Sequence, residues 1–304
     1  MTKPKTTRPT NAMEFFGFAK QREEIRLAKE SGARPPWTQD QALQRHYFCN
    51  IFREDDRTTR WFAENIRGPL AEDLRVVMAT MIFRFMNRID TGERIKACLL
   101  DGRFDRVSLG KALRPAWKKG ERLVTGAYMI KTQTGVDKLE GCLQAFARWP
   151  TEVVTHVLTY FGDTPPDERT LQETHSILKK GPFLGPFLAY EIVTDLRHTE
   201  MLRHAADINT WASAGPGCER GLSRVWTGKT DQFPSYYGPA GQAFMNERMQ
   251  ELLKLSRHPD MWSWPSRPWE MREVEHTACE YDKYKRYYEG GRMKRRYHKG
   301  GYKA

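Results

Sequence analysis

Residues 171–211 constrain the fold of this chain more than any other stretch, because they predict two short helices joined by a tight connection. We predict that the first helix begins with Thr164 as its N-cap and Pro165 at its first position, and that it ends at Lys179-Lys180. The connection, residues 181–186, reads Gly-Pro-Phe-Leu-Gly-Pro and is too short for anything but a tight turn.

The second predicted helix has two chemically different faces. Its apolar face is formed by Leu188, Ala189, Ile192, Val193 and Leu196. Its polar face is expected to carry Glu191, Asp195 and His198, which are spaced at i, i+4 and i+7. Asp207 and Trp211 follow this helix, one helical turn apart.

A helical hairpin with a glycine at each end can accept a phosphate, because glycine lets the backbone approach and the next helix presents free N–H groups. We therefore predict DNA-backbone contacts at Lys179, Lys180, Gly181 and Gly185. This pattern resembles the helix-hairpin-helix of DNA glycosylases, in which a catalytic aspartate follows the second helix. Asp207 stands at that place here. An ordinary helical hairpin followed by an N-cap aspartate is the competing interpretation.

Helix signals dominate the rest of the chain, so the predicted fold class is all-α, a helix-hairpin-helix glycosylase-like helical domain. One predicted helix, residues 74–86, is long, apolar and free of proline, and we expect it at the centre of the core. Thr38 is predicted to cap an earlier helix, and residues 123–130 read as a strand or a loop. The expected organisation is a disordered N-terminal tail (1–12), one domain (13–289) and a basic C-terminal tail (290–304).

The net charge of +12 is concentrated at the C-terminal end. Residues 283–304 hold nine Lys or Arg and one acid, a net charge of +8, so about +4 is left for the remainder. Such a segment indicates a polyanionic partner. We expect its basic residues to contact DNA, and the candidates are Arg292, Lys294, Arg295 and Arg296.

The five cysteines are spread along the chain with no CxxC pair, which argues against zinc, an iron–sulfur cluster and a disulfide framework. No apolar run reaches membrane-spanning length. These features predict a cytoplasmic protein without membrane contact. No cofactor is required by the sequence and no metal ligand is predicted, although a divalent or monovalent cation is compatible with the chemistry below.

Four stretches of the sequence are considered together. They are residues 36–38 with 48–57, residues 126–129, the hairpin with 207–217, and residues 274–284. Together they resemble one family, the alpha-glutamyl/putrescinyl thymine pyrophosphorylases. The relatives of this family include amino-acid:DNA transferases and the helical domain of 5-hydroxymethyluracil DNA kinases, found in bacteriophages and some bacteria. The first and last stretches are the most specific, and the resemblance spans residues 36–288.

The resemblance implies a step in thymine hypermodification of DNA. In such pathways 5-hydroxymethyluracil is pyrophosphorylated, and a family member then replaces pyrophosphate with an amino acid or a polyamine. The kinase members add a P-loop domain. This sequence has no GxxxxGK[ST] motif, and Gly110-Lys111 lacks both the upstream glycine and the following Ser or Thr.

This chemistry needs a flipped or single-stranded base, cations around the leaving pyrophosphate and a group that takes a proton from the amine. The catalytic candidates are Asp207, Glu191 and His276. The candidates for binding the substrate and its pyrophosphate are Asn50, Arg53, Arg57, Tyr128, Trp211, Arg220, Arg224 and Lys283. The expected partners are modified DNA and a small amine or amino acid.

Two other functions are compatible with the same residues. Asp207 would face the sugar C1′ in a DNA glycosylase that excises a modified base. Alternatively, the hairpin and the basic tail would serve a non-catalytic DNA-binding module. The arginines can also be surface ion pairs, and Tyr128 can be a buried core residue.

Overall fold

A computed structural model describes residues 8–127 and 129–292, and every regular element in these ranges is a helix. The predicted all-α fold class is confirmed. The described residues of the 123–130 segment form a loop, which decides between the two alternatives that the sequence offered. No described helix is long and apolar enough to cross a membrane.

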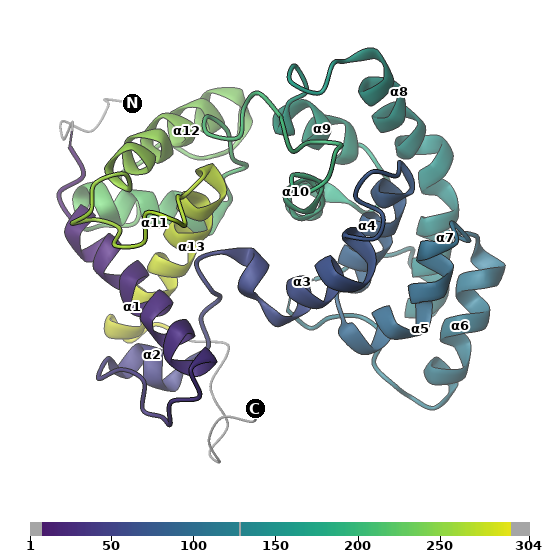
Figure 1. Cartoon of the computed structure of the whole chain (residues 1–304), viewed down its shortest axis with the longest axis horizontal. Helices are drawn as coiled ribbons and strands as arrows, with labels where there is room; N and C mark the ends of the chain where they lie inside the picture. The colour runs from purple at the N-terminus through teal and green to yellow at the C-terminus, as the bar shows by residue number, and fades with distance from the viewer. Residues whose placement is uncertain (1–7, 128, 293–304) are drawn as a thin grey trace. The chain divides into compact units, whose positions relative to one another are not determined.

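The chain divides into two compact units, which are described separately. Unit 1 combines both ends of the chain, up to Asp56 and from Asn209 onward, and unit 2 is the continuous segment Arg57–Ile208. In Figure 1 the N-terminal helices, drawn in purple, lie beside the C-terminal helices of unit 1, drawn in green and yellow.

Unit 1 is built on a close pair of helices, α11 (Pro216–Thr227) and α13 (Met271–Tyr288). Gly221 permits this approach, because a Cβ atom at that position would lie 1.9 Å from the Ala278 carbonyl oxygen. The remaining helices of the unit are α1 (Ala12–Glu30), α2 (Gln41–Arg45), the short 3₁₀ turn η1 (Arg53–Asp55) and α12 (Gly238–Leu255). Aromatic side chains of α1 and α13 meet Trp269 in the core, where Phe15 packs edge-on against both Trp269 and Tyr281.

Unit 2 surrounds α4 (Arg75–Met86), which is buried from Val76 to Met86, as its apolar sequence predicts. The helices before and after it are α3 (Arg57–Phe62), the π-helical turn η2 (Ala63–Arg67), α5 (Ile89–Leu100) and α6 (Arg106–Lys118). The rest of the unit comprises α7 (Lys138–Trp149), the π-helical turn η3 (Pro150–Val154), α8 (Thr155–Asp163), α9 (Leu171–Leu178) and α10 (Gly185–Leu196).

The predicted hairpin is present, but its first helix begins later than expected. Thr164 ends α8 instead of starting α9, because α8 continues to Asp163. Thr170 is the N-cap of α9, and its hydroxyl accepts a hydrogen bond from the Glu173 N–H at 3.1 Å. The predicted cap at Thr164 is therefore wrong by six residues.

The second hairpin helix, α10, buries its whole predicted apolar face. Its polar face differs from the prediction, because Asp195 is fully buried and His198 lies beyond the end of the helix. The prediction for Thr38 is also wrong, since Asp40 caps α2 by accepting from the Leu43 N–H at 2.9 Å. At the N-terminus, Thr10 and Asn11 donate side-chain hydrogen bonds to carbonyl oxygens of α11, those of Trp226 and Arg224.

Candidate functional site

Two segments far apart in sequence meet on one face of α13 in unit 1. The Cys49 N–H donates to Glu280 Oε2 at 3.1 Å, and Lys283 bridges the Tyr47 carbonyl oxygen and Glu280 Oε2. These are the two motifs that carry the most specific part of the family resemblance. We call the resulting group the α13 cluster, and its members are Arg22, Cys49, Asn50, Arg53, Asp56, His276, Glu280 and Lys283.

Arg22 of α1 holds the loop of the α13 cluster in place. Its guanidinium donates to the carbonyl oxygens of Cys49 and Asn50, each at 2.9 Å. The side chain is buried, and its Nη1 has no hydrogen-bond partner among the described residues. Burial lowers the pKa of Arg22, while the charge of Glu280 opposes this shift. A buried donor with no partner costs about 1–3 kcal/mol, so this position is prepared for an additional acceptor.

The loop that follows Cys49 folds back on itself through Asn50. The Asn50 N–H donates to Asp56 Oδ1 at 3.1 Å, and the Asn50 side chain donates to the Asp55 carbonyl oxygen at 3.0 Å. Burial raises the pKa of Asp56 to about 6, against the opposing effect of this hydrogen bond and of Arg53. Asp56 is thus a carboxyl group that can titrate near neutral pH.

His276 lies on α13 within the same cluster. Burial, and then the charges of Arg272 and Arg22, hold the pKa of this imidazole well below its usual value. Its Nε2 is buried and has no hydrogen-bond partner in the part of the chain that the structure describes. The imidazole is therefore neutral at neutral pH and offers a lone pair or a proton to a ligand.

Three members of the α13 cluster could hold a metal ion. Cys49 Sγ, a carboxylate oxygen of Asp56 and a ring nitrogen of His276 all lie within 4.8 Å of one another. Among the described residues, no other group of three or more His, Cys, Asp or Glu side chains meets this criterion.

Four of the residues predicted to serve the reaction are thus close together: Asn50, Arg53, His276 and Lys283. Arg53 is buried in the short turn η1. Lys283 also lies over the Phe48 ring, 4.2 Å from its centroid. Arg57 is exposed and is the first residue of unit 2.

Arg220 and Arg224 of α11, which were predicted to bind the substrate and its pyrophosphate, both pair with Asp282 of α13. Arg220 Nε lies 3.0 Å from Asp282 Oδ2, and Arg224 Nε lies 3.1 Å from Asp282 Oδ1. Arg224 also pairs with Glu289. Because Asp282 is fully buried, these ion pairs fix α11 to α13. Trp211 is buried in unit 1.

Asp207 lies in unit 2, where it accepts two backbone hydrogen bonds from the start of α9. Its Oδ1 binds the Leu171 N–H at 2.7 Å and its Oδ2 binds the Gln172 N–H at 2.9 Å. Burial raises its pKa, and these hydrogen bonds oppose the shift. Such contacts favour a structural role at the helix N-terminus. Glu191 is half-buried on α10 of the same unit.

The two hairpin glycines differ in what they contribute. A Cβ atom at Gly181 would lie 2.7 Å from a Leu184 side-chain atom, so this glycine serves internal packing. Gly185 has a φ of 54°, a conformation that favours glycine, and no atom lies within 4 Å of the position that a Cβ atom would take. This glycine is therefore required by the backbone conformation and not by close packing. Lys179 and Lys180 are exposed at the end of α9.

The sequence matches the family described as the helical domain of 5-hmdU DNA kinase over residues 10–291. The chain belongs to this family. The match covers both units and every described member of the α13 cluster. No curated protein and no solved structure matches the chain.

Membership in the 5-hmdU DNA kinase helical-domain family indicates a role in thymine hypermodification, as an enzyme acting on modified DNA bases. The family resemblance predicted from the sequence is confirmed at this level. Its finer assignment to amine transfer stays a proposal, as does the glycosylase-like hairpin geometry.

Three members of the α13 cluster were absent from the candidate residues: Arg22, Cys49 and Asp56. Cys49 and Asp56 lie inside one of the two most specific motifs, so the motif itself was the available signal. Arg22 lies outside these motifs, and only the tertiary packing of α1 brings it next to the Cys49 carbonyl oxygen. Tyr128, Lys294, Arg295 and Arg296 lie outside the described residues, and Arg292 is exposed.

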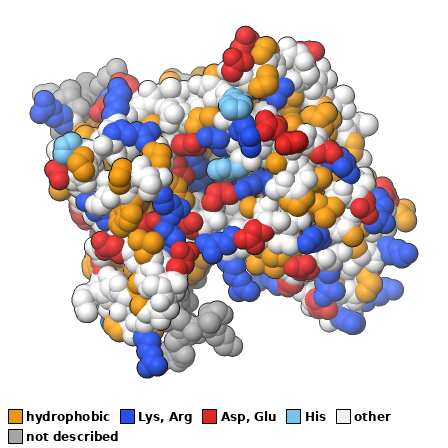
Figure 2. Space-filling view, in the orientation of Figure 1, with side chains coloured by type: hydrophobic (Ala, Val, Ile, Leu, Met, Phe, Trp, Pro, Cys, Tyr) orange, Lys and Arg blue, Asp and Glu red, His pale blue; other side chains and the backbone are white. Residues whose placement is uncertain are grey.

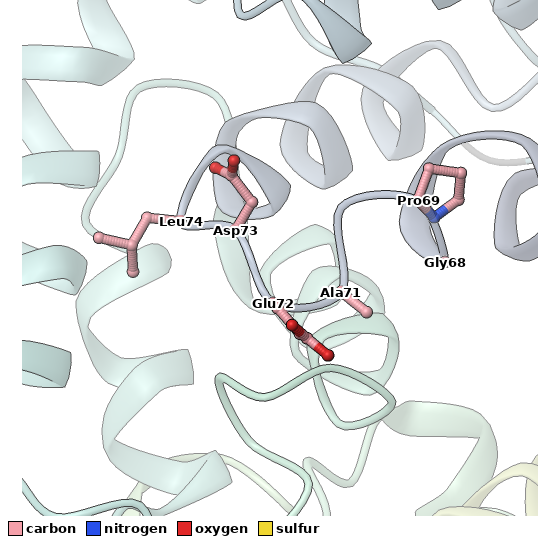
Figure 3. A pocket seen from close by; sticks show the side chains of 6 residues that line it. All are labelled: Gly68, Pro69, Ala71, Glu72, Asp73 and Leu74. Atoms are coloured by element: carbon pink, nitrogen blue, oxygen red, sulfur yellow. The ribbon is translucent and has the colours of Figure 1, made fainter.

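The surface offers weaker candidates. A depression of about 610 Å³ is lined by the backbone turn from Gly68 to Leu74 (Figure 3). Its lining includes the carboxylates Glu72 and Asp73 and no cation, so it does not suit a phosphate. On the face shown in Figure 2, basic and acidic side chains are interspersed and do not form a single basic field.

Proposed function

We propose that this chain transfers an amine onto the 5-methylene carbon of pyrophosphorylated 5-hydroxymethyluracil in DNA and releases pyrophosphate. Family membership supports a role in thymine hypermodification. The 304 residues contain no GxxxxGK[ST] motif, so they do not supply the phosphate-binding loop of a P-loop kinase. A step after phosphorylation therefore fits these residues better than phosphorylation itself.

The reaction is a substitution at carbon. The amine lone pair forms a C–N bond to the methylene, while the C–O bond to pyrophosphate breaks and its electron pair leaves with the pyrophosphate. The attacking nitrogen then loses a proton to a base. The target base leaves the stack for this step, because its methylene is inaccessible in a paired duplex.

The observation that carries this proposal is the convergence of cations and proton acceptors in the α13 cluster. Arg22, Arg53 and Lys283 come from three separate segments of the chain. Arginine and lysine near a phosphoryl oxygen stabilise the negative charge that develops on a leaving pyrophosphate. We assign that role to Arg53 and Lys283, with Arg22 supplying its unpartnered Nη1.

The proton acceptor belongs to the same cluster, and two side chains fit the role. Glu280 presents a carboxylate beside Lys283, with 3.2 Å between its Oε2 and Nζ. His276 presents a neutral imidazole. General-base catalysis by such a group contributes a factor of about 10²–10⁴.

The test uses duplex and single-stranded DNA that carries the pyrophosphorylated base. The protein is incubated with this DNA with and without polyamines or amino acids, and the DNA is digested to nucleosides for mass spectrometry. A heavier nucleoside that requires the amine is the expected result. Release of free base would instead identify a glycosylase, and binding without any new product would identify a DNA-binding module.

Variants connect the activity to the α13 cluster. We expect Lys283→Ala and Glu280→Gln each to lower kcat by a factor of about 10² or more while DNA affinity is retained. Arg94→Ala is the matched control, because Arg94 forms an exposed ion pair with Glu121 in unit 2. If all three variants had the same activity, Lys283 and Glu280 would have no role in the reaction, and the assignment of the α13 cluster would be wrong.

A further inference from the structure

We propose that Cys49, Asp56 and His276 bind one divalent transition-metal ion, and that zinc fits them best. This goes beyond amine transfer, since the family description names no metal. The three side chains supply a sulfur, an oxygen and a nitrogen whose ligand atoms lie within 4.8 Å of one another. Zinc accepts this combination of ligands.

The distances suit a small ion after modest side-chain rotation. Zinc–ligand bonds of about 2.0–2.3 Å place two ligand atoms of a tetrahedral site about 3.5 Å apart. Three protein ligands leave the fourth position open, as in catalytic zinc sites. In the α13 cluster, an open position would lie beside the residues assigned to the pyrophosphate.

An independent observation also points to a ligand at this place. His276 Nε2 is buried without a hydrogen-bond partner among the described residues, although an imidazole nitrogen in such surroundings normally has one. A metal ion would satisfy its lone pair.

The ligands are held by surrounding hydrogen bonds, as ligands of metal sites usually are. The Asn50 N–H fixes one oxygen of Asp56 at 3.1 Å. The backbone at Cys49 is fixed on both sides, because its N–H donates to Glu280 and its carbonyl oxygen accepts from Arg22. These contacts orient Cys49 and Asp56 before any ion arrives.

Three of the nearby cations are already engaged by acceptors, although Nη1 of Arg22 has none among the described residues. Arg22 binds two carbonyl oxygens, Lys283 pairs with Glu280, and Arg272 Nη1 lies 3.5 Å from Glu275 Oε2.

The charges also balance when the ion binds. The Cys49 thiol releases its proton to solvent and becomes a thiolate, as metal coordination requires. One thiolate and one carboxylate then neutralise the two positive charges of the ion. With His276 occupied as a ligand, Glu280 is the remaining acceptor for the amine proton in the proposed reaction.

The experiment titrates Co²⁺ into metal-stripped full-length protein and records its absorption spectrum. A cobalt–thiolate charge-transfer band in the near ultraviolet, saturating at one ion per chain and abolished by excess Zn²⁺, is the expected result. Cys49→Ser should abolish the band, and Asp56→Asn should weaken binding at least tenfold. Cys279→Ser is the matched control, because Cys279 lies on α13 and, like Cys49, is a free cysteine whose pKa is raised by burial.

The control variant should bind cobalt as the wild type does. The inference is overturned if the wild type gives no thiolate band, or if Cys49→Ser keeps it. A second measurement avoids variants that fail to fold: Zn²⁺ should protect Cys49 of the wild type from alkylation, mapped by peptide mass spectrometry. Equal alkylation with and without Zn²⁺ would also overturn it. None of these readouts depends on amine transfer, so they separate the metal site from the proposed activity.

Discussion

Unit 2 and the α13 cluster of unit 1 differ in how their buried ionisable side chains are satisfied. In unit 2, Asp195 is paired with Arg67 and Arg84, and Asp207 accepts two backbone N–H groups. In the α13 cluster of unit 1, His276 Nε2 and Arg22 Nη1 are buried without hydrogen-bond partners among the described residues. Satisfied buried charges stabilise one packing arrangement, whereas unsatisfied ones with shifted pKa values are typical of binding and catalytic sites.

The strongest test of this contrast is Asp195→Ala. The substitution leaves Arg84, which is almost fully buried, and Arg67 without their shared carboxylate. Removing one partner of a buried ion pair costs about 3–5 kcal/mol, so we expect unit 2 to unfold at a much lower denaturant concentration. Circular dichroism during urea unfolding measures this loss.

Asp73→Ala is the control for Asp195→Ala. Asp73 pairs with Arg75 at 2.6 Å, but both side chains are well exposed. Exposed pairs contribute about 0–1 kcal/mol. If the two variants lost similar amounts of unfolding free energy, burial would not distinguish the two ion pairs. The conclusion that the buried pairs of Asp195 stabilise unit 2 would then be wrong.

A second prediction concerns a carboxyl group of unit 1 at the start of α13. Glu273 is buried, its Oε2 accepts from the Glu270 N–H at 2.8 Å, and burial raises its pKa to about 7. The folded protein thus keeps this proton up to about pH 7, whereas the unfolded chain releases it near its ordinary value of 4.5. Stability from Glu273 is complete below pH 4.5 and is lost as the pH rises through 7.

We therefore expect the free energy of unfolding of Glu273→Gln, relative to wild type, to increase between pH 5 and pH 8. The increase approaches about 3 kcal/mol, the free-energy equivalent of this pKa shift. Urea unfolding at a series of pH values measures the difference, in which the other titrating groups cancel. A difference that is constant over this range would show that Glu273 is ionised in the folded protein.

The sequence predicted most of the fold because local patterns determine most of it. The apolar run of α4 and the apolar face of α10 are visible as periodicity. The start of α9 was misplaced because Thr164-Pro165 and Thr170 both carry cap signals, and only packing decides between them. The burial of Asp195 was missed because its spacing relative to Glu191 fits a polar face, and its partner Arg84 is 111 residues away.

The site was harder to predict, for a physical reason. The α13 cluster joins Cys49 to Glu280 across 231 residues, and no sequence spacing describes such a contact. The argument against zinc from the spread of the cysteines considered cysteine spacing alone. A site with one cysteine, one aspartate and one histidine from distant segments has no signature of that kind.

A third prediction tests the role of Asp207 directly. Asn at this position can accept one of the two N–H groups of α9, but its amide nitrogen would face the other donor. We expect Asp207→Asn to cost about 1–2 kcal/mol of stability and to leave kcat of the folded protein within a few fold. Thr170→Ala, which removes the neighbouring cap, should cost about 1 kcal/mol and serves as the comparison.

The opposite outcome would revive the prediction made from the sequence. If Asp207→Asn lowered kcat at least a hundredfold with an unchanged melting temperature, Asp207 would be a catalytic group. Unit 2 would then contribute to the chemistry, and the contrast between the units would be wrong in its main claim.

The smallest expected effects concern DNA-backbone contacts, which the sequence assigns to the hairpin and to the C-terminal tail. Gly185→Val is a poor probe of the hairpin, because the positive φ at Gly185 strains any side chain there. The exposed pair Lys179 and Lys180 is a cleaner choice. If both contact phosphates, Lys179→Ala with Lys180→Ala should reduce the slope of log affinity against log salt by about 2.

Deletion of residues 290–304 is the parallel test for unit 1, and it removes six of the Lys and Arg residues. We expect this deletion to flatten the salt dependence more than the lysine pair does, because more basic side chains are lost. Fluorescence anisotropy with unmodified DNA at several salt concentrations measures both slopes. A lysine pair with no effect on the slope would remove the hairpin from the DNA interface. DNA contact would then be left to other residues, and the contrast between a structural unit 2 and a functional unit 1 would become sharper.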